Sequence, residues 1–449
     1  MTTQLTNADI ATLADNTIFP TLNSGTGNLW EKTTLLSIKS IVNKDTSIVV
    51  DNVAALKLLD AADGQIVMTN GYNSANDGGA GIYRVQVSYN KTDEFGSGFT
   101  LTNSNVAVLI SEIKKTEHWG VFADGVTNWE TNDKTRFHKM LSYAQYETLH
   151  FSPGLYKTEI NLHNRYNNLS LHFNNTELGG VLHLISSNTV IRKADILSIV
   201  EEGETLLITT TASHNATTSR KITFRNTLTS LDNVEIVAEI VSANQLRVNE
   251  NLTGNLSANG YLFDAPIRNI RLTGHLICYE RFGTINCHNL SGSLDITCKE
   301  DINKSANGTG GRGVHIYYGS KFFNLGTIIV ENNEAQDTAV NNQAAIGIDG
   351  DGVLNKEMIL EGIYAELLHI KNCRTNGILI QGINHRFKNV IIDNWGSDIT
   401  NPLSAIPYMN YVDYDGNDIR DEQCAVFLHN TNAIIDNLCI NQIGFAGRS

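Results

Sequence analysis

Apolar and polar positions alternate along most of the chain, and from position 265 onward the alternation recurs in pairs of short segments. The first segment of each pair is rich in valine and isoleucine and spans residues 314–317, 346–349, 378–381 and 426–429. The second segment ends in an amide residue and spans residues 328–332, 368–372, 390–394 and 438–442. Such recurrence predicts a solenoid, because each coil buries its apolar side only by stacking on its neighbours.

Two kinds of side chain are expected at defined places in this solenoid. The amides that end the second segments fall at one corner, where we predict a hydrogen-bonded ladder of Asn332, Asn372, Asn394 and Gln442.

The six cysteines lack C-x-x-C spacing, and most follow an apolar or β-branched residue in a strand-like run. We therefore expect buried free thiols rather than disulfides or a zinc site.

A different pattern runs from residue 117 to residue 162. One face of a short predicted helix carries four apolar residues at helical spacing, namely Phe137, Met140, Leu141 and Ala144. An Asp124-Gly125 loop precedes this helix, and a strand, a Ser-Pro-Gly corner at residues 152–154 and a second strand follow it. In order and spacing this stretch resembles the entrance to the right-handed parallel β-helix of the pectate-lyase-like superfamily. In that superfamily the helix covers the first coil.

Short strands separated by turn residues occupy residues 47–113, directly before this entrance. Together the two stretches resemble the neck and β-helix of bacteriophage tailspikes. Residues 193–263 interrupt the coil pattern with a meander of strands, which predicts a small inserted antiparallel barrel. The expected fold is therefore all-β, a right-handed parallel β-helix with an N-terminal neck domain and a small inserted antiparallel β domain.

The resemblance and the pattern together predict five divisions of the chain. These are a virion-attachment arm (1–48), a neck-like domain (49–114), the β-helix entrance with its capping helix and first coils (115–192), the inserted barrel (193–264) and the main β-helix (265–449).

Composition narrows the classes of partner. The 449-residue chain has 33 lysines and arginines against 47 aspartates and glutamates, a net charge of −14. This balance argues against nucleic acid as a partner, although a local basic patch can still bind an acidic glycan. No apolar run reaches about 18 residues, so no membrane span is expected. The first residues show neither the basic nor the apolar region of a secretory signal.

Outward positions of successive coils should lie in register about 4.8 Å apart. Carboxylates on adjacent coils would then be roughly 5 Å apart, and those two coils apart roughly 9 Å, which brackets the retaining and inverting geometries of glycoside hydrolysis. The densest acid cluster on the repeats is made of Glu334, Asp337, Asp349 and Asp351. We expect the catalytic pair to combine one of the first two with one of the last two.

The alternative is that Asp349 and Asp351 only shape the turn of an Asp-Gly-Asp-Gly sequence. The full calcium-loop pattern is absent, and no metal or other cofactor is expected. A further acid, Glu331, precedes a ladder amide and is expected to be structural.

Side chains suited to substrate binding lie on the preceding coil and in the loops beside the cluster, namely Arg312, His315, Tyr317, Trp395 and Tyr411. Aromatic faces stack on pyranose rings, which favours saccharide contact. In a lyase, Arg312, His315 and Tyr317 would carry out β-elimination, because this reaction needs a base and neutralisation of a sugar carboxylate.

The resemblance implies a tailspike in the virion tail that acts at the host cell surface. Such proteins are parallel homotrimers attached to the phage tail or baseplate through the N-terminus, and they bind and depolymerise a bacterial surface polysaccharide such as capsule or O-antigen. We therefore expect an endo-acting glycoside hydrolase. The alternatives are a polysaccharide lyase and a non-catalytic receptor-binding spike of the same fold.

Overall fold

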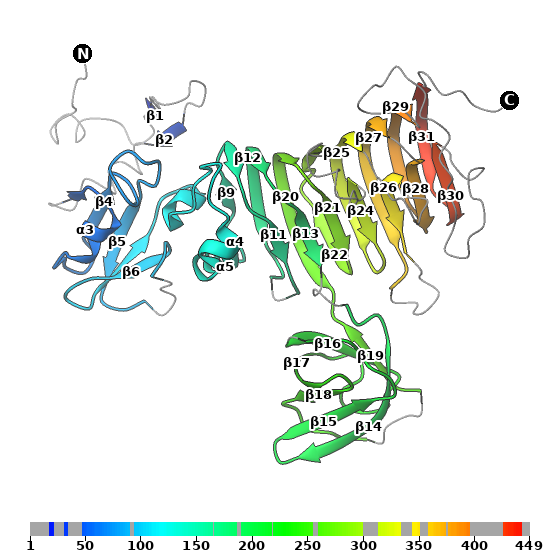
Figure 1. The fold of residues 1–449 in the computed structure, drawn as a ribbon. Coiled ribbons are helices and arrows are strands. Elements are labelled where there is room, and N and C mark those ends of the chain that lie inside the picture. Colours follow the sequence, from blue (N-terminus) through cyan, green and yellow to red (C-terminus); the bar gives the residue numbers. More distant parts are fainter. Residues whose placement is uncertain are drawn as a thin grey trace. The chain divides into compact units, whose positions relative to one another are not determined.

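The computed structural model describes residues 18–21, 31–34, 47–89, 94–164, 166–185, 190–217, 219–254, 259–299, 313–333, 344–350, 358–373, 376–395 and 425–441. Most secondary structure in these ranges is β-strand (Figure 1). The chain divides into two compact units. The first comprises Met1–Phe122 and Thr135–Met140, and the second comprises Ala123–Lys134 and Leu141–Ser449.

The first unit contains a five-stranded sheet. Its strands lie in the order β3 (Ile48–Val50), β4 (Ile66–Thr69), β5 (Ile82–Gln86), β7 (Val106–Leu109) and β6 (Gly98–Thr100). Its other elements are β1 (Ile18–Thr21), β2 (Glu31–Thr34), α3 (Val53–Lys57), β8 (Lys114–Lys115) and the 3-10 helix η1 (Thr116–Trp119). The buried rings of Tyr83 and Phe99 pack with their centroids 5.7 Å apart. The short strands predicted for residues 47–113 are thus confirmed.

Two parallel sheets form the body of the second unit. The small sheet contains β11 (Ile160–Leu162), β13 (Leu182–Ile185), β21 (Phe282–Ile285), β24 (Val314–Tyr317), β26 (Ala344–Asp349), β28 (Asn376–Gly382) and β30 (Val426–Thr431). The large sheet contains β9 (Leu149–Phe151), β10 (Gly154–Tyr156), β12 (Ser170–Leu178), β20 (Ile267–Cys278), β22 (Cys287–Ser291), β23 (Asp295–Lys299), β25 (Lys321–Asn333), β27 (Glu361–Cys373), β29 (Arg386–Trp395) and β31 (Ile434–Asn441).

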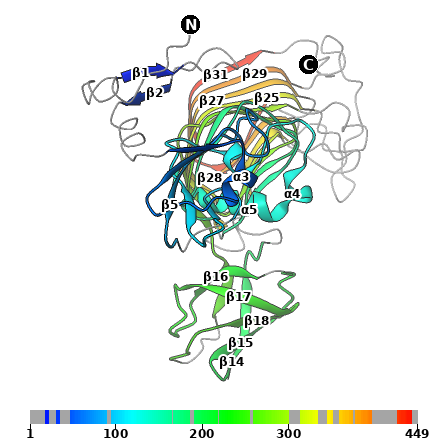
Figure 2. The same cartoon turned by 90° about the vertical axis from the view of Figure 1, so that its left-hand side faces the viewer.

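Along the repeats the chain passes alternately through the small and the large sheet, which makes this body a parallel β-helix. Figure 2 looks along the stack, so that β25, β27, β29 and β31 appear one behind another. Ile316, Ile348 and Ile380 of the small sheet pair in register and are at most 1% exposed. The predicted apolar column and paired segments are therefore confirmed.

The predicted helix is also present. It corresponds to α5 (Lys134–Tyr143), and a further short helix, α4 (Trp129–Asn132), precedes it. The apolar stripe is buried throughout, with exposed fractions of 1% or less at Phe137, Met140, Leu141 and Ala144.

Asparagines form a ladder at a corner other than the predicted one. Asn269 Nδ2 donates to Asn168 Oδ1 at 2.9 Å, and Asn289 Nδ2 donates to Asn269 Oδ1 at 3.0 Å. All three residues have φ between 56° and 61°, a left-handed conformation that asparagine tolerates better than most residues. The ladder predicted from the repeats lies outside the described side chains, which do not include Asn332, Asn372, Asn394 and Gln442.

Three of the cysteines confirm the expectation of buried free thiols. Cys278, Cys287 and Cys298 are buried, and Cys278 pairs in register with Cys298 on the neighbouring strand. Cys439 is free but exposed. It pairs with Ile391, and the side chains at these two positions point away from the apolar interior of the β-helix. It also lies on β31, the last described strand of the large sheet.

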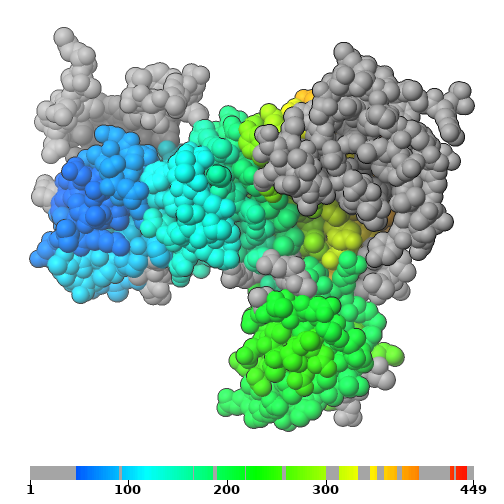
Figure 3. All heavy atoms as spheres, in the orientation of Figure 1, coloured from blue at the N-terminus to red at the C-terminus, as the bar shows by residue number. Residues whose placement is uncertain are grey.

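The inserted domain is a closed antiparallel barrel between β13 and β20. Its strands close in the order β14 (Ala194–Glu202), β15 (Thr205–Thr210), β18 (Gln245–Val248), β17 (Glu235–Ser242), β16 (Arg220–Arg225) and β19 (Tyr261–Asp264). Its core includes the fully buried residues Ile208, Ile222, Phe224, Leu246 and Leu262. In the space-filling view the barrel residues, coloured green, pack into one continuous body (Figure 3). The predicted inserted barrel is confirmed.

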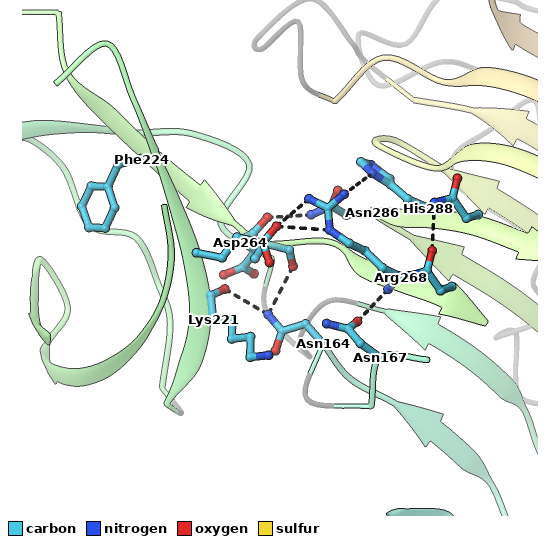
Figure 4. Close-up of polar contacts among 12 residues, drawn as sticks. Asn164, Asn167, Lys221, Phe224, Asp264, Arg268, Asn286 and His288 are labelled. Atoms are coloured by element: carbon cyan, nitrogen blue, oxygen red, sulfur yellow. Dashed lines mark hydrogen bonds and ion pairs between the residues drawn. The ribbon is translucent and has the colours of Figure 1, made fainter. Parts of the chain in front are cut away.

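Buried polar contacts join the barrel to the β-helix (Figure 4). The Asp264 carboxylate accepts from Arg220 Nη1 at 3.2 Å, and the Asp264 carbonyl accepts from Asn286 Nδ2 at 2.7 Å. Asn164 Nδ2 donates to the carbonyl oxygens of Lys221 at 2.9 Å and Ala265 at 3.2 Å. The side chains of Arg220 and Asp264 are only 2% and 0% exposed. These contacts satisfy buried charges and amides that would otherwise oppose folding.

Candidate functional site

The small sheet brings predicted site residues from adjacent coils together. Tyr317 of β24 pairs in register with Asp349 of β26, and His315 pairs with Gly347. Gly347 carries no side chain beside the imidazole, and His315 Nε2 donates to Asp349 Oδ1 at 2.8 Å. The sequence-based expectation that outward groups of neighbouring coils line up is confirmed for these residues.

Asp349 is buried although it occupies an outward position. It is 6% exposed, and every residue of β26 is buried. A buried carboxylate is destabilising unless hydrogen bonds or an opposite charge compensate for the lost hydration. The hydrogen bond from His315 provides such compensation. Next to this pair, the Gly350 backbone N–H donates to Gln381 Oε1 at 2.9 Å and links the turn to the following coil.

Aromatic rings extend the site from His315 toward the inserted barrel. The His315 and Tyr317 ring centroids are 4.5 Å apart, and those of Tyr317 and Tyr318 are 4.1 Å apart. Arg192, just before β14, places its guanidinium carbon 4.0 Å from the Tyr318 ring centroid and 5.7 Å from that of Tyr317. Tyr318 itself is buried in a cluster with Phe263 and Met358.

Arg192 was not among the predicted site residues. It is far from Tyr317 in the sequence, and no motif connects the two positions. The only available signal was its place at the start of the predicted insertion.

A second histidine borders the pair on the preceding coils. His183 of β13 lies over Gly283 of β21, where a Cβ atom would come within 2.7 Å of the imidazole Cδ2. Burial, together with the positive charges of Arg281 and His315, lowers the pKa of His183 to about 4. His183 is therefore neutral at pH 7.

This pKa predicts a loss of stability in mild acid. Below pH 6.5 the unfolded state binds a proton at His183 that the folded state does not, so the stability present at pH 7 is lost as the pH falls toward 4. At pH 5 this loss amounts to about 2 kcal/mol. Unfolding curves at pH 7 and pH 5 should therefore differ less for His183→Gln than for the wild type. Parallel losses in both proteins would contradict the prediction.

The remaining predicted site residues are not placed. Asp351, Glu334, Asp337, Arg312 and Tyr411 lie outside the described residues. Trp395 ends β29, but its side chain is outside the described part. Pairing of Asp349 with Glu334 or Asp337 stays a prediction, and among the described residues the structure places His315 in hydrogen-bond contact with Asp349.

Glu331 belongs to a different surface. It lies on β25 of the large sheet, where its carboxylate is 2.9 Å from Lys371 Nζ and 3.8 Å from Lys299 Nζ. These three residues occupy one row of paired strands, so alternating charges run from coil to coil. This position agrees with the structural role expected for Glu331.

Within the described ranges, no group of three or more histidine, cysteine, aspartate or glutamate residues could hold a metal ion. Nor is any helix in those ranges both long and apolar enough to cross a membrane.

No known family model matches the sequence. A search of curated proteins also finds no match. Solved structures do resemble the chain. One is WceF of Pantoea stewartii, described as a glycan biofilm modifying enzyme with a bacteriophage tailspike-like parallel β-helix fold. It has 10% sequence identity and a TM-score of 0.36, and the match covers 88% of this chain and 48% of WceF.

Two tailspikes show similar values. The enzymatically active domain of tailspike protein 2 of bacteriophage CBA120 has 12% identity and a TM-score of 0.28, with 90% of this chain and 55% of that chain covered. A tailspike of the Acinetobacter baumannii bacteriophage Fri1, described as a capsular polysaccharide depolymerase, has 10% identity and a TM-score of 0.27, with 88% and 59% covered. The chain thus spans about half the length of these structures.

Proposed function

We propose that this chain is a bacteriophage tailspike that binds and depolymerises a bacterial surface polysaccharide. The observation that carries the proposal is the partly buried hydrogen bond between His315 and Asp349, beside the ring of Tyr317, on the side of a parallel β-helix. A carboxylate for proton transfer and a ring for sugar stacking are thereby combined on adjacent coils.

In glycoside hydrolysis, Asp349 would act as one member of a carboxyl pair. Its protonated form gives a proton to the glycosidic oxygen, or its ionised form activates water. His315 positions this carboxyl through the 2.8 Å hydrogen bond. We assign the second carboxyl to Glu334 or Asp337, with Asp351 as the alternative to Asp349. Arg312, Trp395 and Tyr411 are assigned to saccharide binding.

The same hydrogen bond favours one second candidate function, a polysaccharide lyase. A carboxylate that accepts a hydrogen bond from a histidine orients the imidazole ring and makes the imidazole a stronger base. In this reading His315 is the base that removes the proton next to the sugar carboxylate, and Asp349 is its positioning partner.

Purified protein spotted on lawns of encapsulated bacteria is expected to produce halos, and incubation with the extracted polysaccharide is expected to shorten it. New reducing ends without ultraviolet absorbance of an unsaturated sugar indicate hydrolysis, whereas a rise in that absorbance indicates elimination. Binding without shortening would assign the chain to non-catalytic receptor-binding spikes. Absence of both binding and shortening across a broad panel of capsules and O-antigens would overturn the proposal.

The proposal includes the assembly. A parallel homotrimer would attach to the phage tail or baseplate through residues 1–48 and act at the host cell surface. Sedimentation of the purified chain at three times its monomer mass is the expected result.

A further inference from the structure

We propose that the inserted barrel is part of the saccharide site, and that Arg192 at its root recognises a carboxylate group of an acidic sugar. This inference rests on the proposed function and deepens it, because it names the class of polysaccharide and assigns a role to the insertion.

The position of Arg192 carries the first step. Its guanidinium carbon lies over the rings of Tyr318 and Tyr317, and the Tyr317 ring contacts the ring of His315. The contacts therefore run without a break from the barrel entry to the His315–Asp349 pair. A sugar ring seated against Tyr317 would lie between the proposed catalytic group and the guanidinium.

The second step is that the main chain next to Arg192 is held rigidly. The Ile191 N–H donates to Asp264 Oδ2 at 3.0 Å, and the Asp264 N–H donates to the Ile191 carbonyl at 2.9 Å. Asp264 is in turn held by Arg220. It is also held by Asn286 of the β-helix, which Figure 4 shows beside it. The barrel is thus fixed at the point where Arg192 leaves it, and a fixed group loses less entropy when a ligand binds.

The third step concerns charge. Positive charges on Arg281 and His315 contribute to the lowered pKa of His183. The Arg192 guanidinium lies over the Tyr317 ring, which contacts the ring of His315. Asp349 lies beside His315 and accepts a hydrogen bond from it. In a chain with a net charge of −14, such a concentration of positive charge favours an anionic ligand locally.

The chemistry of arginine completes the argument. A guanidinium that stacks on an aromatic face keeps its N–H groups in its own plane, where two of them match the two oxygens of a carboxylate. Uronic acids carry such a carboxylate. The purely structural alternative is that Arg192 only clamps the barrel onto the β-helix through its cation–π contacts.

The test uses the polysaccharide that the wild-type protein shortens, before and after its carboxylates are activated with a carbodiimide and reduced to alcohols with borohydride. We expect reduction to raise the wild-type KM about 10- to 100-fold, the usual effect of losing a charge-assisted hydrogen bond. Arg192→Gln should show the same increase in KM on the native polymer, with a smaller change in kcat. On the reduced polymer the wild type and this variant should be equal.

Arg247→Gln is the matched control, because Arg247 lies on the barrel and pairs with Glu202 and Glu239 away from the aromatic rings. It should behave as the wild type on both polymers. The inference is overturned if reduction leaves the wild-type KM unchanged, or if Arg192→Gln lowers the melting temperature without changing KM. Arg192 would then only hold the barrel on the β-helix. A wild type that neither binds nor shortens any polysaccharide overturns the proposed function instead.

Discussion

Asp349→Asn is expected to lower kcat for polysaccharide shortening by about 10²- to 10⁴-fold, the range for removal of a general acid or base. The amide can still accept the hydrogen bond from His315, which the carboxylate accepts at 2.8 Å, so the fold should be retained. It cannot exchange a proton with the substrate at neutral pH. Release of reducing ends, or of unsaturated ends, measures the rate, and retained polysaccharide binding confirms an intact site.

The chain contains a matched control for this variant. On the large sheet, His369 Nε2 lies 2.7 Å from Asp393 Oδ2, a histidine–aspartate pair like that of the site. Asp393→Asn changes the same chemistry on a different face and should leave the rate unchanged. A wild-type rate for Asp349→Asn, or equal losses in the two variants, would remove Asp349 from the proposed mechanism.

Asp264→Ala is expected to lower the free energy of unfolding of the barrel by about 3–5 kcal/mol, because it removes the carboxylate that pairs with the buried Arg220 guanidinium. It also removes the acceptor for the Ile191 N–H at the barrel entry. Hydrogen exchange of the barrel strands, read by mass spectrometry, measures this loss. Faster exchange should extend to the segment around Arg192.

Glu202→Ala is the control for the second variant. It breaks an ion pair with Arg247 whose side chains are 42% and 35% exposed. Exposed pairs contribute little in water, so the barrel should lose no more than about 1 kcal/mol. If the two variants changed hydrogen exchange equally, the contacts of Asp264 would not be what holds the barrel.

Local patterns were sufficient to predict the repeating coils. The alternation in residues 314–317 and 346–349 places Ile316 and Ile348 in the interior, and it leaves Tyr317 and Asp349 on the other face. Since strand geometry turns successive side chains to opposite faces, sequence order alone gives this assignment. The same reasoning predicted the buried face of α5.

Spacing along the repeats did not predict the polar contacts that the structure shows. The pairing of Asp349 with Glu334 or Asp337 stays a prediction, and the hydrogen bond from His315 to Asp349 on the next coil was not among the expected contacts. The asparagine ladder forms between Asn168, Asn269 and Asn289, which no common repeat length connects, because the barrel separates the first from the other two.

By itself, then, the sequence determined the all-β solenoid, the inserted barrel and the outward placement of His315, Tyr317 and Asp349, because these depend on periodicity within short segments. Only the tertiary structure brought Arg192 onto the rings of Tyr317 and Tyr318 and tied Ile191 to Asp264. Those contacts join segments on either side of the barrel. These contacts form because the folded barrel brings its two ends together, and the spacing of residues along the chain does not reveal which residues meet there.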